Sequence, residues 1–155
     1  LIESSRSINM VICNYLFMGL ILYLIRNKKE LKYNMSYKAA VVIGLSQVFA
    51  LLPGISRSGI TIACAMLLGI KKEETVRFSF VMSIPLILGA SVYKIEDITS
   101  LAHESIELIL YGFIVSAIVG YIAIRWMIKI IEFDAFWKFS VYCWLIAIIL
   151  LFSSL

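Results

Sequence analysis

The chain has 155 residues, of which 62% are apolar and 15% are charged, with a net charge of +4 and a mean hydropathy of +0.98. Soluble domains average about 45 to 50% apolar and about 25% charged residues, so the composition excludes an ordinary soluble domain and indicates a membrane protein. No nucleic-acid partner is expected. The sequence begins at Leu1 without the features of a signal peptide, and we interpret it as a piece of a longer protein.

Four apolar runs approach the roughly 20 residues that a helix needs to cross a bilayer. They cover residues 8–25, 75–93, 106–124 and 139–152, and the last reaches full length if it begins near Phe136. Pro85 is expected to kink the second run, as membrane helices tolerate. Cysteines 13, 64 and 143 lie within apolar stretches without the spacing of a metal site, and are expected to be small buried side chains.

Residues 39–70 are also apolar, but the sequence PGISRSG interrupts them at 53–59. The arms 39–52 and 60–70 would span only about 21 and 16 Å as helices at 1.5 Å per residue. Neither arm alone crosses a hydrocarbon core about 30 Å thick. The segment is therefore one broken crossing, two crossings, or a re-entrant hairpin that leaves on the side where it entered.

Charge separates these alternatives, because basic residues mark cytoplasmic loops. A re-entrant hairpin places 11 of the 14 basic residues on one side, whereas a single crossing would divide them. The three basic clusters are Arg26, Lys28, Lys29, Lys32 and Lys38; Lys71, Lys72 and Arg77; and Arg125, Lys129 and Lys138, in the last inter-helix loop. We therefore predict an all-α integral membrane protein in which a single domain, 1–155, has four transmembrane helices and a re-entrant hairpin over 39–70.

The tip of this hairpin would place Arg57 near the middle of the membrane, where a charge costs about 2.5 to 3.5 kcal/mol and normally faces a cavity and a partner. A helix starting near Ser58 would offer free N–H groups that attract phosphate, and arginine binds phosphate with a planar fork of donors. The neighbouring hydroxyls and flexible glycines are Ser56, Ser58, Thr61, Gly54 and Gly59. The pattern predicts an anion site. Alternatively, Arg57 pairs with a structural carboxylate and the serines satisfy broken backbone.

The stretches GLSQVFALLPGISRSGIT and VRFSFVMSIPLILGA resemble the second half of the undecaprenyl-diphosphate phosphatases, also called bacitracin-resistance proteins. That family carries the motif P-G-x-S-R-S-x-x-T, which residues 53–61 match. The resemblance implies a membrane enzyme of two inverted repeats, of which this chain is one. It would hydrolyse undecaprenyl diphosphate to undecaprenyl phosphate, the carrier lipid of cell-wall synthesis.

The resemblance also implies roles for individual residues. Arg57 and Ser56 would be catalytic. The substrate-binding residues would be Ser58, Thr61, Gly54, Gly59 and Gln47. For Gln47, a buried amide bonded to a neighbouring helix is an equally good interpretation.

The other half of the family carries the motif E-x-x-x-E-F-L-P-x-S-S-T-G-H, which this chain lacks. His103, the only histidine, falls in the predicted acidic outer loop and is not expected to be catalytic. The family suggests a divalent cation, Mg or Ca, whose ligands would lie in the missing half, and this chain is expected to hold no metal itself. The implied partners are a polyprenyl diphosphate lipid, membrane lipids and the missing N-terminal repeat, in a bacterial plasma membrane; a homodimer is left open.

The main rival from another class is a transporter of an anionic or lipid-phosphate substrate, because inverted repeats with broken helices are also the plan of many carriers. A purely structural subunit is the third alternative. An acidic motif before a matching upstream hairpin would favour hydrolysis.

Overall fold

The computed structural model describes the backbone of residues 2–27 and 33–153, and the side chains of residues 8–27, 33–94 and 106–153. Helices make up nearly all of this part of the chain. The α-helices are α1 (Ile2–Leu24), α2 (Tyr37–Ser46), α3 (Arg57–Leu67), α4 (Lys72–Tyr93), α5 (Ile95–Glu132) and α6 (Phe139–Ser153); short 3-10 helices are η1 (Ile25–Asn27), η2 (Gln47–Leu51) and η3 (Phe136–Lys138).

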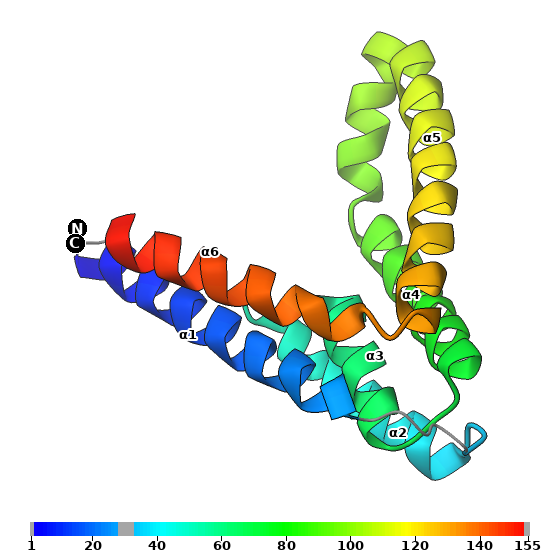
Figure 1. The fold of residues 1–155 in the computed structure, drawn as a ribbon. Helices are drawn as coiled ribbons and strands as arrows, with labels where there is room; N and C mark the ends of the chain where they lie inside the picture. Colours follow the sequence, from blue (N-terminus) through cyan, green and yellow to red (C-terminus); the bar gives the residue numbers. More distant parts are fainter. Residues whose placement is uncertain (1, 28–32, 154–155) are drawn as a thin grey trace.

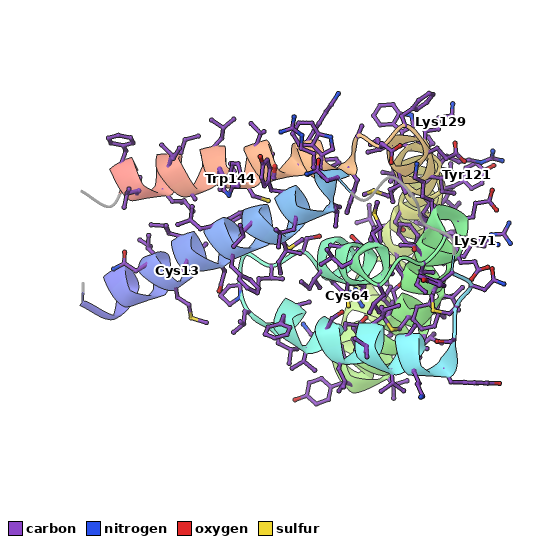
Figure 2. The ribbon with its side chains drawn as sticks, turned by 60° about the horizontal axis from the view of Figure 1, so that its bottom comes forward. Cys13, Cys64, Lys71, Tyr121, Lys129 and Trp144 are labelled. Carbon is purple, nitrogen blue, oxygen red and sulfur yellow. The ribbon has the colours of Figure 1, made fainter. Side chains whose placement is uncertain are left out.

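The long helices form two pairs that diverge from a common centre (Figure 1). Helices α1 and α6 run side by side in opposite directions, with the start of α1 next to the end of α6. Helices α4 and α5 form the second pair, and the short helices α2 and α3 lie where the two pairs meet. Gly19 lets α1 approach α6 closely, because a Cβ atom there would overlap the indole ring of Trp144, which Figure 2 labels.

Four stretches among the described residues are long and apolar enough to cross a membrane: Ile8–Asn27, Lys72–Tyr93, Ile106–Glu132 and Phe136–Ser153. Each contains one of the four predicted spans. The prediction of an all-α, multi-pass membrane protein is confirmed. Pro85 lies within α4, which continues through it as a helix.

The end of the third predicted span, and the loop predicted after it, were wrong. Because α5 runs from Ile95 to Glu132, Arg125 and Lys129 lie on a helix rather than in a loop, and the backbone of the predicted acidic outer loop is helical too. Glu, Lys and Arg are good helix formers, so a change from apolar to charged residues does not end a helix. The side chains of residues 95–105, including His103, and all of residues 28–32, which hold three of the predicted basic cluster, lie outside the described set.

The most buried helix is α3, at the centre of the structure. Ile62 and Ala63 are fully buried, and they pack in a cluster that includes Met18 of α1, Val76 of α4 and Ile131 of α5. Residues 106–126 of α5 are instead exposed almost throughout although they are mostly apolar. An apolar surface of this extent suits lipid as its surroundings rather than water.

The cysteines are only partly as predicted. Cys143 is buried and Cys64 half-buried within the helical assembly, but Cys13 is exposed on the outer side of α1 (Figure 2). In a membrane span an exposed apolar side chain faces lipid, so the hydrophobic character of a residue does not place it inside the protein.

Residues 33–70 form a hairpin of short helices whose two outer ends meet. The N–H of Tyr33 donates to the carbonyl of Gly69 at 3.0 Å, and the N–H of Lys71 donates to the carbonyl of Tyr33 at 3.0 Å. Gly69, with φ of +78°, makes the turn that allows this pairing. The segment therefore leaves the helical assembly close to where it entered, which is the geometry that a re-entrant hairpin requires.

The predicted basic clusters converge on this end of the structure. Arg26 stacks on the ring of Trp137, with its guanidinium carbon 4.7 Å from the ring centroid. The Lys72 ammonium lies 2.8 Å from the Asp134 carboxylate, which joins the start of α4 to the turn after α5. Together with the Tyr33 and Lys71 pairing, these contacts join residues of the first two clusters to the turn between α5 and α6, which lies beside the third cluster.

We expect single cysteines at Asn34 and Lys71 to lie on the same, cytoplasmic side of the membrane, because both are exposed at the joined ends of the hairpin. Tyr93, at the far end of α4 and also exposed, is the control and should lie on the opposite side. The measurement is labelling of full-length protein in intact cells with an impermeant thiol reagent, after replacement of every native cysteine, including Cys13, Cys64 and Cys143. Labelling of Asn34 and Lys71 from opposite sides would contradict the re-entrant hairpin.

Candidate functional site

The site is the loop and first turn of α3, where the PGISRSG sequence lies. Helix α3 begins at Arg57, one residue before the predicted start, and Ser56 caps it by accepting a hydrogen bond from the N–H of Gly59 at 3.2 Å. Such a cap stabilises a helix by about 0.5 to 2 kcal/mol. Ser56 therefore has a structural role, and its hydroxyl proton is still free to be donated to another group.

Helix α1 holds the loop in place. The side-chain amide of Asn14 donates to the carbonyl of Pro53 at 2.8 Å. Gly54 has a φ of +95°, and a Cβ atom there would lie 3.3 Å from the ring of Tyr15. Gly59 is buried, and its Cβ would lie 2.8 Å from the terminal methyl of Met18. The two motif glycines therefore allow α1 to pack directly against the backbone of the loop and of the first turn.

Arg57 is half-buried, and its Nη1 atom is buried without a hydrogen-bond partner among the described residues. A buried donor without a partner costs about 1 to 3 kcal/mol, and more when it is charged. Guanidinium nitrogens are donors only, so the missing partner must be an acceptor. This end of Arg57 therefore has the chemistry to bind an anionic ligand, or a carboxylate from elsewhere in the full-length protein.

Unlike Nη1 of Arg57, the hydroxyl of Thr61 already has hydrogen-bond partners among the described residues. The residue is 1% exposed, and its Oγ1 lies 3.0 Å from the carbonyl oxygen of Arg57 and 2.6 Å from the Oγ of Ser79 on α4. Its spacing of four residues places Thr61 on the same face of α3 as Arg57. The sequence alone gave no reason to connect Ser79 with the motif.

A cavity of about 380 Å³ lies on the other side of the motif, between α1, the start of α3 and the start of α6. Gly54, Ser56, Ser58 and Gly59 line it, whereas Arg57, Thr61 and Gln47 do not. The rest of its wall is mainly apolar and comes from Tyr15, Met18, Leu22, Ile55, Met127, Phe136, Phe139, Tyr142 and Cys143. The structure thus divides the predicted site residues between two faces of α3.

Gln47, the remaining predicted site residue, is half-buried at the start of η2. Its side chain makes no hydrogen bond within the described structure, and neither of its two proposed roles is tested. The apolar wall of the cavity was missed in the sequence, since residues such as Phe139 and Cys143 are ordinary members of a membrane span. These residues can be recognised as cavity residues only when the packing of α6 against α1 is known.

The described residues do not fit a divalent cation. Among them, no three His, Cys, Asp or Glu side chains come together in a group that could hold a metal ion. The carboxylate of Glu74, for example, accepts a hydrogen bond from the N–H of Met35 at the base of the hairpin. Its role there is to hold the hairpin to α4.

The helices and the motif define a multi-pass membrane protein with a capped, arginine-bearing helix start at its centre. Residues 1–149 match the family described as Bacitracin resistance protein BacA, and the chain belongs to this family. This confirms the family resemblance found in the sequence.

Several curated relatives carry the name undecaprenyl-diphosphatase. The chain is 41% identical over 140 residues to the one from Methanobrevibacter smithii, covering 88% of this chain and 50% of the relative. It is 43% identical over 140 residues to undecaprenyl-diphosphatase 1 from Bacillus licheniformis, covering 88% and 52%. For undecaprenyl-diphosphatase 1 from Halalkalibacterium halodurans the identity is 38% over 150 residues, covering 94% and 55%. The chain thus spans about half the length of these relatives.

Proposed function

We propose that the full-length protein containing this chain is a membrane phosphatase that hydrolyses undecaprenyl diphosphate to undecaprenyl phosphate and inorganic phosphate. The observation that carries the proposal is the buried Nη1 of Arg57, which has no hydrogen-bond partner among the described residues and belongs to the first residue of a helix capped by Ser56. The names of the relatives support hydrolysis over transport. In the reaction, an oxygen nucleophile bonds to the terminal phosphorus and the bond to the bridging oxygen breaks.

Phosphoryl transfer depends mainly on positioning and on electrostatic stabilisation, and this chain offers groups for both. Arg57 would bind oxygens of the diphosphate and stabilise the charge that develops as the anhydride bond breaks. Ser56 and Ser58 would donate hydrogen bonds to phosphate oxygens. The free N–H groups of the first turn of α3 add to the positive potential.

The cavity beside the serines suits the apolar part of a lipid substrate. Its volume of about 380 Å³ is in the range of small-molecule sites, which is about 300 to 1,000 Å³. Ser56 and Ser58 line the same cavity as its apolar wall. A ligand with a phosphate group and a hydrocarbon chain has this combination of properties.

The metal and the nucleophile are proposed to come from outside this chain. The family suggests Mg or Ca, and the described residues form no group of ligands for it. We therefore propose that the other half of the full-length protein supplies the carboxylates and activates the nucleophile, and that the undecaprenyl diphosphate site lies between the two halves.

We expect the 155-residue chain alone to release no phosphate from undecaprenyl diphosphate, while the full-length protein, or this chain co-expressed with the missing half, does. The measurement is inorganic phosphate release in detergent, with the Bacillus licheniformis relative as the reference. Strong turnover by the chain alone would contradict the divided site. Failure of the full-length protein where the reference is active would contradict the proposed function.

A further inference from the structure

A buried pair of hydroxyls, one of them from the last residue of the motif, joins α3 to α4. The Oγ1 of Thr61 and the Oγ of Ser79 lie 2.6 Å apart, and the two residues are 1% and 5% exposed. Among the described residues, this is the one hydrogen bond that the Ser79 side chain makes. Hydrogen bonds in such a dry place are stronger than those in contact with water.

The direction of the protons can be assigned from the neighbouring contacts. Thr61 lies within bonding distance of two carbonyl oxygens, those of Arg57 at 3.0 Å and Ser58 at 3.3 Å, and these can only accept. A hydroxyl has a single proton to donate. The arrangement that satisfies every group has Ser79 donating to Thr61, and Thr61 donating to the carbonyl of Arg57.

This relay connects α4 to the backbone of the arginine itself. Arg57 is the first residue of α3, and a helix end is the part most free to shift or fray. Ser56 restrains the same turn through its bond to Gly59 on the cavity side, while Thr61 and Ser79 restrain it on the opposite side. The position of the guanidinium follows from the position of this backbone.

We infer that Ser79 is a positioning residue for Arg57, acting through Thr61, and that it fixes the first turn of α3 where Arg57 meets the diphosphate. This rests on the proposed function for the role of Arg57. It gives Thr61 a role different from the phosphate contact that the sequence suggests. Ser79 touches neither the cavity nor the unpartnered Nη1 atom through any hydrogen bond of its own.

The chain offers a matched control in Ser83, one helical turn further along the same face of α4. The Ser83 hydroxyl donates to the carbonyl of Phe80 at 2.6 Å, within its own helix. Ser83→Ala therefore removes the same group from the same helix without affecting α3. Loss of the Ser83 hydroxyl should leave kcat/KM at the wild-type level.

The test is made in the full-length protein with Ser79→Ala, Thr61→Val, the double variant, Thr61→Ser and Ser83→Ala. A hydrogen bond contributes about 0.5 to 1.5 kcal/mol net, so we expect Ser79→Ala to lower kcat/KM per folded molecule by roughly 2- to 12-fold, with a small decrease in melting temperature and no loss of folded protein at the assay temperature. The double variant should be no worse than the more severe single variant, because both remove one relay. Thr61→Ser, which keeps the hydroxyl, should be more active than Thr61→Val.

Three results would overturn the inference. The first is an equal decrease of kcat/KM in Ser79→Ala and Ser83→Ala. The second is a decrease in the Ser79→Ala, Thr61→Val double variant that equals the sum of the two single effects in free energy. The third is a decrease of activity that only follows the loss of folded protein. Binding of inorganic diphosphate by calorimetry is the readout that does not depend on turnover, and Ser79→Ala should weaken it while Ser83→Ala does not. Wild-type protein that binds diphosphate but does not hydrolyse the lipid would count against the proposed function alone.

Discussion

Replacing Arg57 with alanine in the full-length protein is expected to lower turnover of undecaprenyl diphosphate about 10²- to 10³-fold. Removal of one donor that stabilises developing charge typically costs about 2.7 to 4 kcal/mol. The buried Nη1 atom, with no acceptor in the described part of the chain, is the donor that we expect to be lost. The measurement is specific activity per folded molecule, with folding followed by gel filtration and melting temperature.

Arg57→Lys is the matched variant, because it keeps the charge and removes the planar fork of donors. If Arg57 binds two phosphate oxygens at once, lysine should recover only a small part of the activity. If Arg57 instead pairs with a structural carboxylate, Arg57→Ala should leave that carboxylate buried and unpaired, and folded protein should fall together with activity. A well-folded Arg57→Ala protein with nearly wild-type turnover would remove the central residue of the proposed site.

The membrane spans could be predicted from the sequence because apolar run length alone decides them. The end of α5 could not, since Arg125 and Lys129 are charged yet continue the helix to Glu132. Charge marks where the membrane ends, whereas helix ends depend on caps and turns. At the end of α5 the turn is made by Asp134, which has a φ of +53°, a conformation that Asp adopts more readily than most residues.

The site shows a similar division. Ser56 and Arg57 could be singled out because a serine and a charged residue stand out in an apolar segment, but the sequence did not predict that Ser56 caps the helix. Ser79 could not, because its link to Thr61 depends on how α4 packs across α3, 18 residues away in the chain. The cavity could not be predicted for the same reason, as its wall combines α1 with α6. Sequence patterns show the polar residues of one segment but not which other segments contact them.

After Arg57, Gly54 is the motif residue at which we expect a substitution to lower turnover most. With φ at +95°, Gly54 adopts a conformation that residues with a Cβ atom rarely take, and such strain costs about 1 to 3 kcal/mol. A Cβ would also lie 3.3 Å from the ring of Tyr15 and 3.4 Å from the carbonyl oxygen of Val11. The carbonyl belongs to the backbone of α1, which cannot move as easily as a side chain.

We therefore expect Gly54→Ala to displace the loop before α3, lower the melting temperature and reduce turnover at least tenfold, which corresponds to about 1.4 kcal/mol in the barrier. Gly54→Asn separates the two causes, because Asn tolerates positive φ better than Ala but still brings a Cβ toward Tyr15. If backbone strain dominates, Asn should recover activity; if the contact with α1 dominates, Asn should be at least as harmful as Ala.

The control for Gly54 is Gly44, on α2 of the same hairpin. Apart from its chain neighbours and the nearby backbone of its own helix, no described atom lies within 4 Å of the place where a Cβ of Gly44 would stand, and the residue is inside a helix. Alanine is favoured over glycine there by up to about 1 kcal/mol, so Gly44→Ala should match or exceed the wild-type melting temperature. A Gly54→Ala protein as stable and as active as Gly44→Ala would show that the loop does not need its glycine, and that the approach of α1 to the motif does not fix the site.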